Sequence, residues 1–393
     1  MINKFSFLVL ILLVVLAGCS KSTDGISASS ADRSAGLISL AASGSGPGNP
    51  GNQTQPGVIT AGEWNDLDNW TFLNTLLSKE EFKKWPGYWQ FYHSSRISVY
   101  VVGTDSLPVV DAVVKLKMNG TLIFTSRTDN KGKAELWPGL FEGNQSKGFF
   151  NLAIDINNGA KSISNVKMYK DGINRVVLSP VSPVNKIEVA LVVDATGSMG
   201  DELEFLKTEL YDVIARVKAD NPQSSLATSS VFYRDNGDAY VTRISSFTGD
   251  INSTINFIKG QRAEGGGDFP EAVHTALEKA VNELQWSAHA KTRLLFLLLD
   301  APPHYTTPII SSLQASVTKA AEKGIKIIPI TASGINKETE FLMRFLSVTT
   351  NGTYVFITNH SGIGNNHLEP TVGKYDVEFL NNLMVRLINK YAQ

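Results

Sequence analysis

The C-terminal half of the sequence predicts an α/β fold with a mostly parallel open sheet and helices on both faces. Two observations carry this prediction. Apolar runs that suit strands buried on both faces, such as KIEVALVV and RLLFLLL, recur along residues 184–393. They alternate with amphipathic segments of helical period, such as DELEFLKTELYDVIARV. This alternation is typical of Rossmann-like, doubly wound sheets.

Residues 96–182 predict a second, all-β region. Alternating segments such as SVYVVG and AVVKLKM are separated by the turn signals MNG and TDNKG, as in a small β-sandwich. The stretch DSLPVVDAVVKL…TSRTDNKGKAEL resembles the transthyretin-like, or carboxypeptidase-regulatory-like, modules of bacterial surface proteins, which implies an Ig-like spacer. We interpret Asp105, Asp111 and Asp129 as turn residues rather than calcium ligands.

Residues 58–95 predict a helical segment with an unusual concentration of aromatic side chains. We interpret them as core residues or as packing between domains, with a ligand platform as the alternative. They are Trp64, Trp70, Phe72, Phe82, Trp85, Tyr88, Trp89, Phe91 and Tyr92.

The N-terminus predicts export. One lysine precedes an apolar run in residues 1–18 that is too short to span a bilayer and suits a signal peptide. The following LAGC resembles the lipobox of bacterial lipoproteins, which implies cleavage before Cys19 and acylation of its thiol. The alternative is an ordinary secretory signal. Residues 19–57, rich in Ser, Gly, Pro and Asn, predict a flexible tether.

These features predict a lipid-anchored protein of the bacterial cell envelope, at the outer membrane or cell surface. Cys19 is the only cysteine, so disulfides are excluded. The net charge is −1 and no basic block stands out, which argues against nucleic acid as a partner.

Oxygen-bearing side chains gather where strands of the C-terminal half are expected to end. They are Asp194, Thr196 and Ser198 after the first strand, Asp268 in GGGDFPE, and Asp300 after the most apolar strand. Ligands of open α/β sheets bind at the carboxyl ends of the strands. Two buried aspartates there would repel each other unless a cation lay between them. Oxygen donors of this kind favour Mg²⁺, Ca²⁺ or Mn²⁺ over zinc.

The motifs DATGSMG, GGGDFPEAVHTAL and DAPPH, in this order on an α/β pattern, resemble those of von Willebrand factor type A (VWA) domains. The resemblance covers residues 184–393. It implies a metal-ion-dependent adhesion site (MIDAS) that holds a divalent cation, foremost Mg²⁺, through Asp194, Thr196, Ser198 and Asp300. It also implies an open cation position for a carboxylate of a partner.

Asp268 departs from the family pattern, because many members have threonine at this place. It could bind the cation directly, bind it through water, or cap the next helix while Thr248 supplies the hydroxyl. Direct coordination is favoured, since the preceding glycines allow close backbone approach. A carboxylate there would weaken the attraction of the site for an anionic ligand.

Other polar residues near these motifs have simpler interpretations. Glu271 lies in a first helical turn, where it offsets the helix dipole. His304 either lines the site or is a loop histidine without a function. Arg234 and Asp235 are interpreted as an ion-paired strand end.

The sequence therefore predicts a membrane-anchored binding or adhesion protein without enzymatic activity. Its partner would be a protein or envelope ligand that offers a carboxylate, and the cation would be its only cofactor. One alternative is a structural or degenerate cation site. Another is an esterase-like hydrolase with Ser198 as nucleophile and His304 or His360 as base, since TGSMG half-resembles G-x-S-x-G. The charge of Asp194 beside a developing oxyanion argues against it.

Overall fold

The computed structural model describes residues 56–143, 151–157, 159–179, 184–364 and 366–393. They belong to one compact unit that spans Gln53–Gln393. The predicted signal peptide, Cys19 and nearly all of the predicted tether lie outside the described residues. Within those residues, no helix combines the length and apolarity that a membrane crossing requires.

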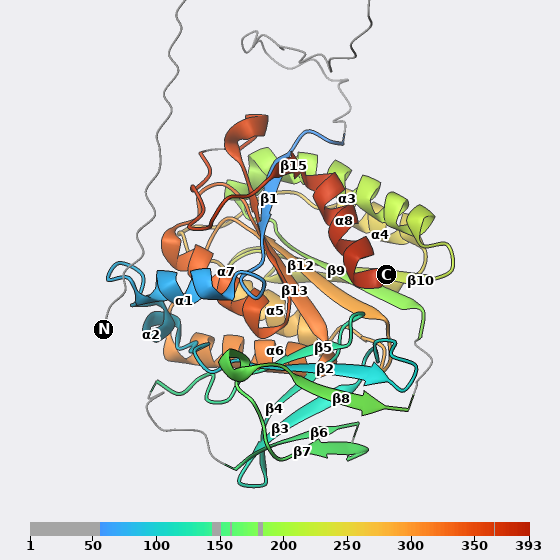
Figure 1. Ribbon diagram of the computed structural model, residues 1–393. Coiled ribbons are helices and arrows are strands. Elements are labelled where there is room, and N and C mark those ends of the chain that lie inside the picture. Colours follow the sequence, from blue (N-terminus) through green and yellow to red (C-terminus); the bar gives the residue numbers. More distant parts are fainter. Residues whose placement is uncertain (1–55, 144–150, 158, 180–183, 365) are drawn as a thin grey trace, which may run out of the picture. The chain divides into compact units, whose positions relative to one another are not determined.

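An eight-stranded mixed sheet organises the α/β part of the molecule (Figure 1). The strands lie in the order β11 (Thr242–Thr248), β10 (Ser225–Tyr233), β9 (Lys186–Asp194), β12 (Thr292–Leu299), β13 (Ile325–Thr331), β14 (Tyr354–Ile357), β1 (Thr60–Trp64) and β15 (Val377–Phe379). Strands β10, β9, β12, β13 and β14 run parallel to one another, whereas β11, β1 and β15 pair antiparallel. The prediction of a mostly parallel α/β sheet is confirmed.

Helices cover both faces of this sheet, and each face has its own hydrophobic core. One core contains side chains of α3 (Gly200–Asp220), α4 (Ile251–Lys259) and α8 (Leu380–Ala392). The other contains side chains of α5 (Val273–Asn282), α6 (Thr307–Lys323) and α7 (Lys337–Thr349). Strand β9 sends Leu191 and Val193 into the first core and Val192 into the second. This two-sided burial explains its continuous apolar run.

The sheet begins earlier in the sequence than the predicted boundary at residue 184, because β1 lies between β14 and β15. The helices α1 (Trp70–Ser78) and α2 (Trp85–Trp89) follow it. Their aromatic residues pack against the α/β part, where Trp85 stacks on Phe341 at 5.8 Å between ring centroids. Within this packed segment Trp89 and Phe91 are fully buried, so burial by the protein itself accounts for them.

A buried ion pair fixes this N-terminal segment to the rest of the α/β part. Asp66 accepts hydrogen bonds from Arg344 Nη2 at 2.7 Å and Nε at 2.8 Å, and neither side chain is exposed. Trp64 Nε1 also donates to Asp66 at 3.0 Å. The segment is therefore an integral part of the fold.

Two small sheets follow in the sequence. One has the order β5 (Lys133–Leu136), β2 (Ile97–Gly103) and β8 (Asn174–Leu178), and the other has the order β4 (Thr121–Arg127), β3 (Val113–Met118), β6 (Leu152–Ile156) and β7 (Lys161–Ile163). Asn119 and Gly120 join β3 to β4 with positive φ angles, as the MNG turn predicts. Both sheets share a core, but Ala321 of α6 and Val348 of α7 belong to it as well. A separate sandwich domain therefore stays a prediction.

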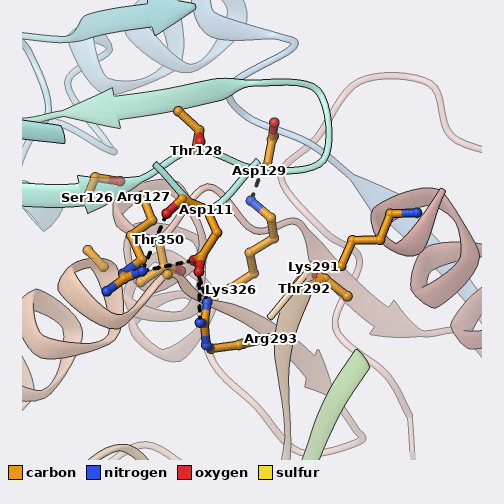
Figure 2. A pocket seen from close by; sticks show the side chains of 12 residues that line it. Asp111, Ser126, Arg127, Thr128, Asp129, Lys291, Thr292, Arg293, Lys326 and Thr350 are labelled. Carbon is orange, nitrogen blue, oxygen red and sulfur yellow. Dashed lines mark hydrogen bonds and ion pairs between the residues drawn. The ribbon is translucent and has the colours of Figure 1, made fainter. Parts of the chain in front are cut away.

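Charged side chains join the small sheets to the amino ends of the parallel strands. Figure 2 shows Asp111 between two guanidinium groups: its Oδ1 lies 2.8 Å from Arg293 Nη1 and 3.1 Å from Arg127 Nη1. Asp129 faces Lys326 at 3.8 Å. Arg293 and Lys326 are second residues of β12 and β13. The small sheets thus lie at the end of the large sheet opposite to Asp194.

Candidate metal centre

Strand β9 ends in a tight cluster of oxygen atoms. Asp194 is fully buried, and its Oδ1 accepts hydrogen bonds from Thr196 N at 2.8 Å and Thr196 Oγ1 at 2.7 Å. Thr196 Oγ1 lies 3.1 Å from Ser198 Oγ. The 3₁₀ turn η2 (Gly197–Met199) then leads into α3. The second carboxylate oxygen, Asp194 Oδ2, is buried and has no hydrogen-bond partner among the described residues.

Asp300 brings a second buried carboxylate to the same end of the sheet. It follows β12, which pairs in parallel with β9 and places Leu298 beside Val193. Asp300 is 4% exposed, and its Oδ1 also lacks a partner among the described residues. Burial first, and then the charge of Asp300, raise the pKa of Asp194 to about 7. Burial likewise raises the pKa of Asp300 to about 6.

Glu271 is a third buried carboxylate of this region. It is 2% exposed, and its Oε2 has no partner in the described part of the chain. Burial first, and then the charge of Asp194, raise the pKa of Glu271 to about 9. The prediction that Glu271 lies in a first helical turn is wrong, because α5 begins at Val273, and the burial of Glu271 was not predicted. The burial depends on a parallel bridge between Glu271 and Pro303, in which Glu271 N donates to Pro302 O at 2.8 Å.

The glycine-rich loop allows these groups to approach. Gly265 and Gly266 have φ angles of +79° and +71°, where glycine is favoured. A Cβ atom at Gly266 would lie 2.8 Å from Glu271 Oε1 and 3.2 Å from Thr196 Cβ. Gly265 O also accepts a hydrogen bond from Gly197 N at 3.0 Å. The loop therefore lies directly over the turn that follows β9.

Asp268 lies in a second group of potential ligands, with Asp235 and His304. One ligand atom from each of these residues lies within 4.8 Å of the others. His304 Nε2 is 2.8 Å from Asp235 Oδ1. Asp235 is buried, Asp268 is exposed and His304 is partly exposed. Direct coordination of the same cation by both Asp268 and Asp194 stays a prediction.

Asp235 was not expected among the potential ligands, because Arg234 and Asp235 were interpreted as an ion-paired strand end. Arg234 is ion-paired there, but with Glu264 and not with Asp235. Arg234 donates to Ala195 O at 3.2 Å, Arg262 O at 2.8 Å and Glu264 Oε2 at 3.2 Å. Strand register, which the sequence alone does not show, brings Asp235 to this end of the sheet, since Tyr233 pairs with Asp194 and Asp235 follows two residues later.

His274 in the first turn of α5 lies beside this second group. Burial lowers its pKa, and the neighbouring His304 lowers it further. Its Nδ1 atom is buried and has no partner among the described residues. His274 belongs to the motif GGGDFPEAVHTAL, but no ligand role was predicted for it.

Thr248 cannot replace Asp268 near Asp194. The antiparallel hairpin places Thr248 opposite Thr228, and Thr228 pairs with Val189. Val189 is five residues from Asp194, which corresponds to about 17 Å along a strand. The alternative that Thr248 supplies a hydroxyl is therefore wrong.

Ser198, the nucleophile of the hydrolase alternative, has no histidine partner among the residues that the structure describes. Ser198 Oγ interacts with Thr196 Oγ1, whereas His304 is bonded to Asp235. His360 is exposed, and its Nδ1 lies 3.2 Å from Thr358 Oγ1. Neither predicted base forms the nucleophile–base hydrogen bond that this chemistry requires.

Comparison with known proteins identifies the α/β part. Residues 188–365 match a family model described as the von Willebrand factor A domain. This part of the chain is a VWA domain, which confirms that portion of the resemblance.

Two curated relatives match shorter segments. The putative ariadne-like RING finger protein R811 of Acanthamoeba polyphaga mimivirus is 34% identical over 119 residues, which are 30% of this chain and 11% of that protein. The alpha-protein kinase vwkA of Dictyostelium discoideum is 23% identical over 171 residues, which are 43% of this chain and 27% of that protein. The chain thus spans a minor part of either relative.

Among solved structures, the conserved hypothetical protein BatB from Bacteroides thetaiotaomicron is similar, with 14% sequence identity and a TM-score of 0.37. The match covers 52% of this chain and 98% of that chain.

Proposed function

We propose that the VWA domain is a binding module that uses a divalent cation to take up a carboxylate of a partner protein or envelope ligand. One observation carries the proposal: two buried carboxylates, Asp194 and Asp300, end neighbouring parallel strands, and each has a buried oxygen without a partner. An ionised carboxylate in such a place is costly unless a positive charge compensates it.

The donor set fits a hard cation. Asp194, Thr196, Ser198 and Asp300 offer only carboxylate and hydroxyl oxygens, and Mg²⁺ prefers oxygen ligands. When bound, Mg²⁺ would supply a local positive charge with a position open to an incoming carboxylate. The two unpartnered oxygens support this assignment, because each would gain the partner that it lacks.

The chain's own residues orient the site. The backbone N–H and the hydroxyl of Thr196 both hold Asp194 Oδ1, so that Oδ2 is available for a ligand role. The buried hydroxyl of Tyr233 also interacts with this carboxylate. Gly197 and Ser198 are exposed at the turn after β9, so a partner can approach from solvent there. Thr196 is buried and acts through the orientation of Asp194 as well as through its own oxygen.

We propose further that Cys19 anchors the protein to a membrane of the bacterial envelope through a lipid. The LAGC sequence supports this anchor. Metabolic labelling with an alkynyl fatty acid tests it: wild type should be labelled, and Cys19→Ser should not. Equal labelling of both proteins would contradict the anchor.

Calorimetric titration of the full-length protein with Mg²⁺ tests the cation site. Saturable binding is expected for wild type and is expected to be lost in Asp194→Ala. Thr196→Val should weaken binding by about 10–100-fold, the usual effect of losing a group that orients a metal ligand. Thr248→Val is the matched control, because it removes the same hydroxyl at the opposite end of the sheet. Wild-type affinity in Asp194→Ala would refute the site.

A pair of short peptides tests the ligand class. One carries a single Asp and the other carries Asn at the same position. Binding of only the Asp peptide, abolished by EDTA, would support carboxylate recognition. Mg²⁺ binding without any peptide binding would instead support the alternative of a purely structural cation.

A further inference from the structure

We propose that Asp235, Asp268 and His304 hold a second divalent cation, of the borderline transition-metal type, beside the proposed Mg²⁺ site. The three ligand atoms lie within 4.8 Å of one another. A small movement of the exposed Asp268 side chain would therefore let all three atoms reach a single ion, which would replace the present hydrogen bond between His304 and Asp235.

The fold brings these three residues together from separate segments. Asp235 follows β10, whose last residue pairs with Asp194 at the end of β9. The parallel bridge between Glu271 and Pro303 clamps two loops side by side. Asp268 lies three residues before one end of this bridge, and His304 directly follows the other end. The cluster is thus built on strand ends and a backbone bridge, which limits its freedom to spread.

The charge balance at this end of the sheet favours a second cation. Within the described residues, neither Asp235 nor Asp268 has an ion pair with a lysine or arginine. Arg234, the nearest candidate along the chain, is occupied by two backbone carbonyls and Glu264. The carboxylates that gather here are Asp194, Asp235, Asp238, Asp268, Glu271 and Asp300. One divalent cation at Asp194 and Asp300 leaves most of this negative charge uncompensated.

Two buried polar atoms next to the cluster point independently to a bound ion. Glu271 is 2% exposed, lies close enough to Asp235 and Asp238 to sense their charges, and leaves Oε2 without a partner. His274, beside His304, leaves Nδ1 buried and unpartnered among the described residues. Buried polar groups in proteins are normally hydrogen-bonded, so unpaired ones indicate a missing water or ion.

The ligand types indicate which class of cation fits. The Asp194 group offers oxygen only, whereas the second group adds imidazole nitrogen from His304, with His274 adjacent. Imidazole together with carboxylate suits Zn²⁺, Mn²⁺ or Co²⁺ better than Mg²⁺. Asp268 is exposed and His304 is partly exposed, so the ion would keep positions open to solvent.

The second site does not depend on the proposed function. A second cation would, however, remove a difficulty of that function. Asp235 and Asp268 add negative charge near the proposed Mg²⁺ site and repel an anionic ligand. Compensation of that charge would restore attraction for a carboxylate.

Titration with Co²⁺ tests the second site, because Co²⁺ bound to imidazole absorbs visible light. The full-length protein, prepared without a histidine tag, is first held in excess Mg²⁺. Wild type is expected to bind one equivalent of Co²⁺ with a visible absorption band. His304→Ala should lose the band and weaken Co²⁺ binding at least tenfold. His360→Ala, which removes an exposed histidine elsewhere, is the matched control.

Two further variants separate this site from the proposed Mg²⁺ site. Thr196→Val should lose Mg²⁺ affinity and keep the Co²⁺ band, whereas Asp235→Asn should do the reverse. Circular dichroism verifies that each variant is folded. Wild-type Co²⁺ binding in both His304→Ala and Asp235→Asn would overturn the inference, as would the absence of Co²⁺ binding to wild type. Failure of Mg²⁺ binding alone would leave the Co²⁺ result intact and count only against the proposed function.

Discussion

Asp194, Asp300 and Glu271 have carboxyl groups that burial makes harder to ionise. Their pKa values lie at about 7, about 6 and about 9, above the ordinary values of 3.8 for Asp and 4.5 for Glu. At a pH between the ordinary pKa values and the raised pKa values, the folded protein therefore binds more protons than the unfolded chain. Stability that depends on these protons is present at low pH and is lost as the pH rises through the folded-state pKa values.

We predict that, in EDTA, the melting temperature falls by roughly 5 °C between pH 7 and pH 9. Asp194 and Glu271 lose protons in this window. The buried histidines do not obscure the effect: the pKa of His93 is lowered to about 3, and an unfolded histidine has already titrated near 6.5. Saturating Mg²⁺ should raise the melting temperature more at pH 9 than at pH 7, because the cation takes the place of the protons. Differential scanning calorimetry measures both effects.

The variant Asp194→Asn supplies the control for this pH dependence. It removes one ionisable group, so its melting temperature in EDTA should depend less on pH than that of wild type. A melting temperature in EDTA that is constant or rises from pH 7 to pH 9 would contradict the prediction.

At the scale of elements, the loop that contains Gly265 and Gly266 brings Glu271 close to the turn after β9. We predict that Gly266→Ala lowers the free energy of unfolding by about 1–2 kcal/mol, the usual cost of a left-handed conformation for a residue with a Cβ atom. It should also weaken Mg²⁺ binding, since the new methyl group would press on Glu271 and Thr196. Urea denaturation and calorimetry provide the two measurements.

Gly267→Ala is the matched control for this loop. A Cβ atom at Gly267 would meet no atom within 4 Å, and its φ is not in the left-handed region. The control should keep wild-type stability and Mg²⁺ affinity. Equal effects of the two substitutions would show that the loop tolerates side chains generally and does not depend on close approach.

Elements with a local pattern could be predicted from the sequence, and elements defined by pairing could not. The apolar run of β9 and the oxygens that follow it are contiguous, so both were visible. Strand β1 was not, because TAGEW is short and its place between β14 and β15 depends on partners nearly 300 residues away. Register explains the other differences: it takes Thr248 toward the far end of the sheet, and it places Asp235 two residues beyond Tyr233, the strand partner of Asp194.

At the scale of the whole molecule, the N-terminal segment around β1 should be essential for folding of the VWA domain. We predict that Asp66→Asn lowers the free energy of unfolding by about 3 kcal/mol, because it removes the closer of the two carboxylates that pair with the fully buried Arg344 and leaves only Glu340, at 3.4 Å. Chemical denaturation measures this loss. Glu80→Gln is the control, since Glu80 pairs with Lys83 at an exposed position and should contribute little. A small effect of Asp66→Asn would mean that the segment is dispensable.

The two small sheets and the candidate metal centre occupy opposite ends of the large sheet, so we expect them to act independently. Asp111 contacts Arg293 at the beginning of β12, whereas Asp300 follows the end of this strand. About seven residues of extended strand, roughly 23 Å, separate the two places. We predict that Asp111→Ala leaves the Mg²⁺ affinity within twofold of wild type, because no charge near the cation site changes.

The same substitution should loosen the contact between the small sheets and the VWA domain. Arg127 and the nearly buried Arg293 would lose their shared carboxylate, so the small sheets should become more sensitive to proteolysis and exchange amide hydrogens faster. Asp105→Ala, which removes only an exposed turn carboxylate that accepts from Leu107 N, should change neither property. A tenfold loss of Mg²⁺ affinity in Asp111→Ala would instead mean that the small sheets regulate the site through β12, and a spacer role would no longer describe them.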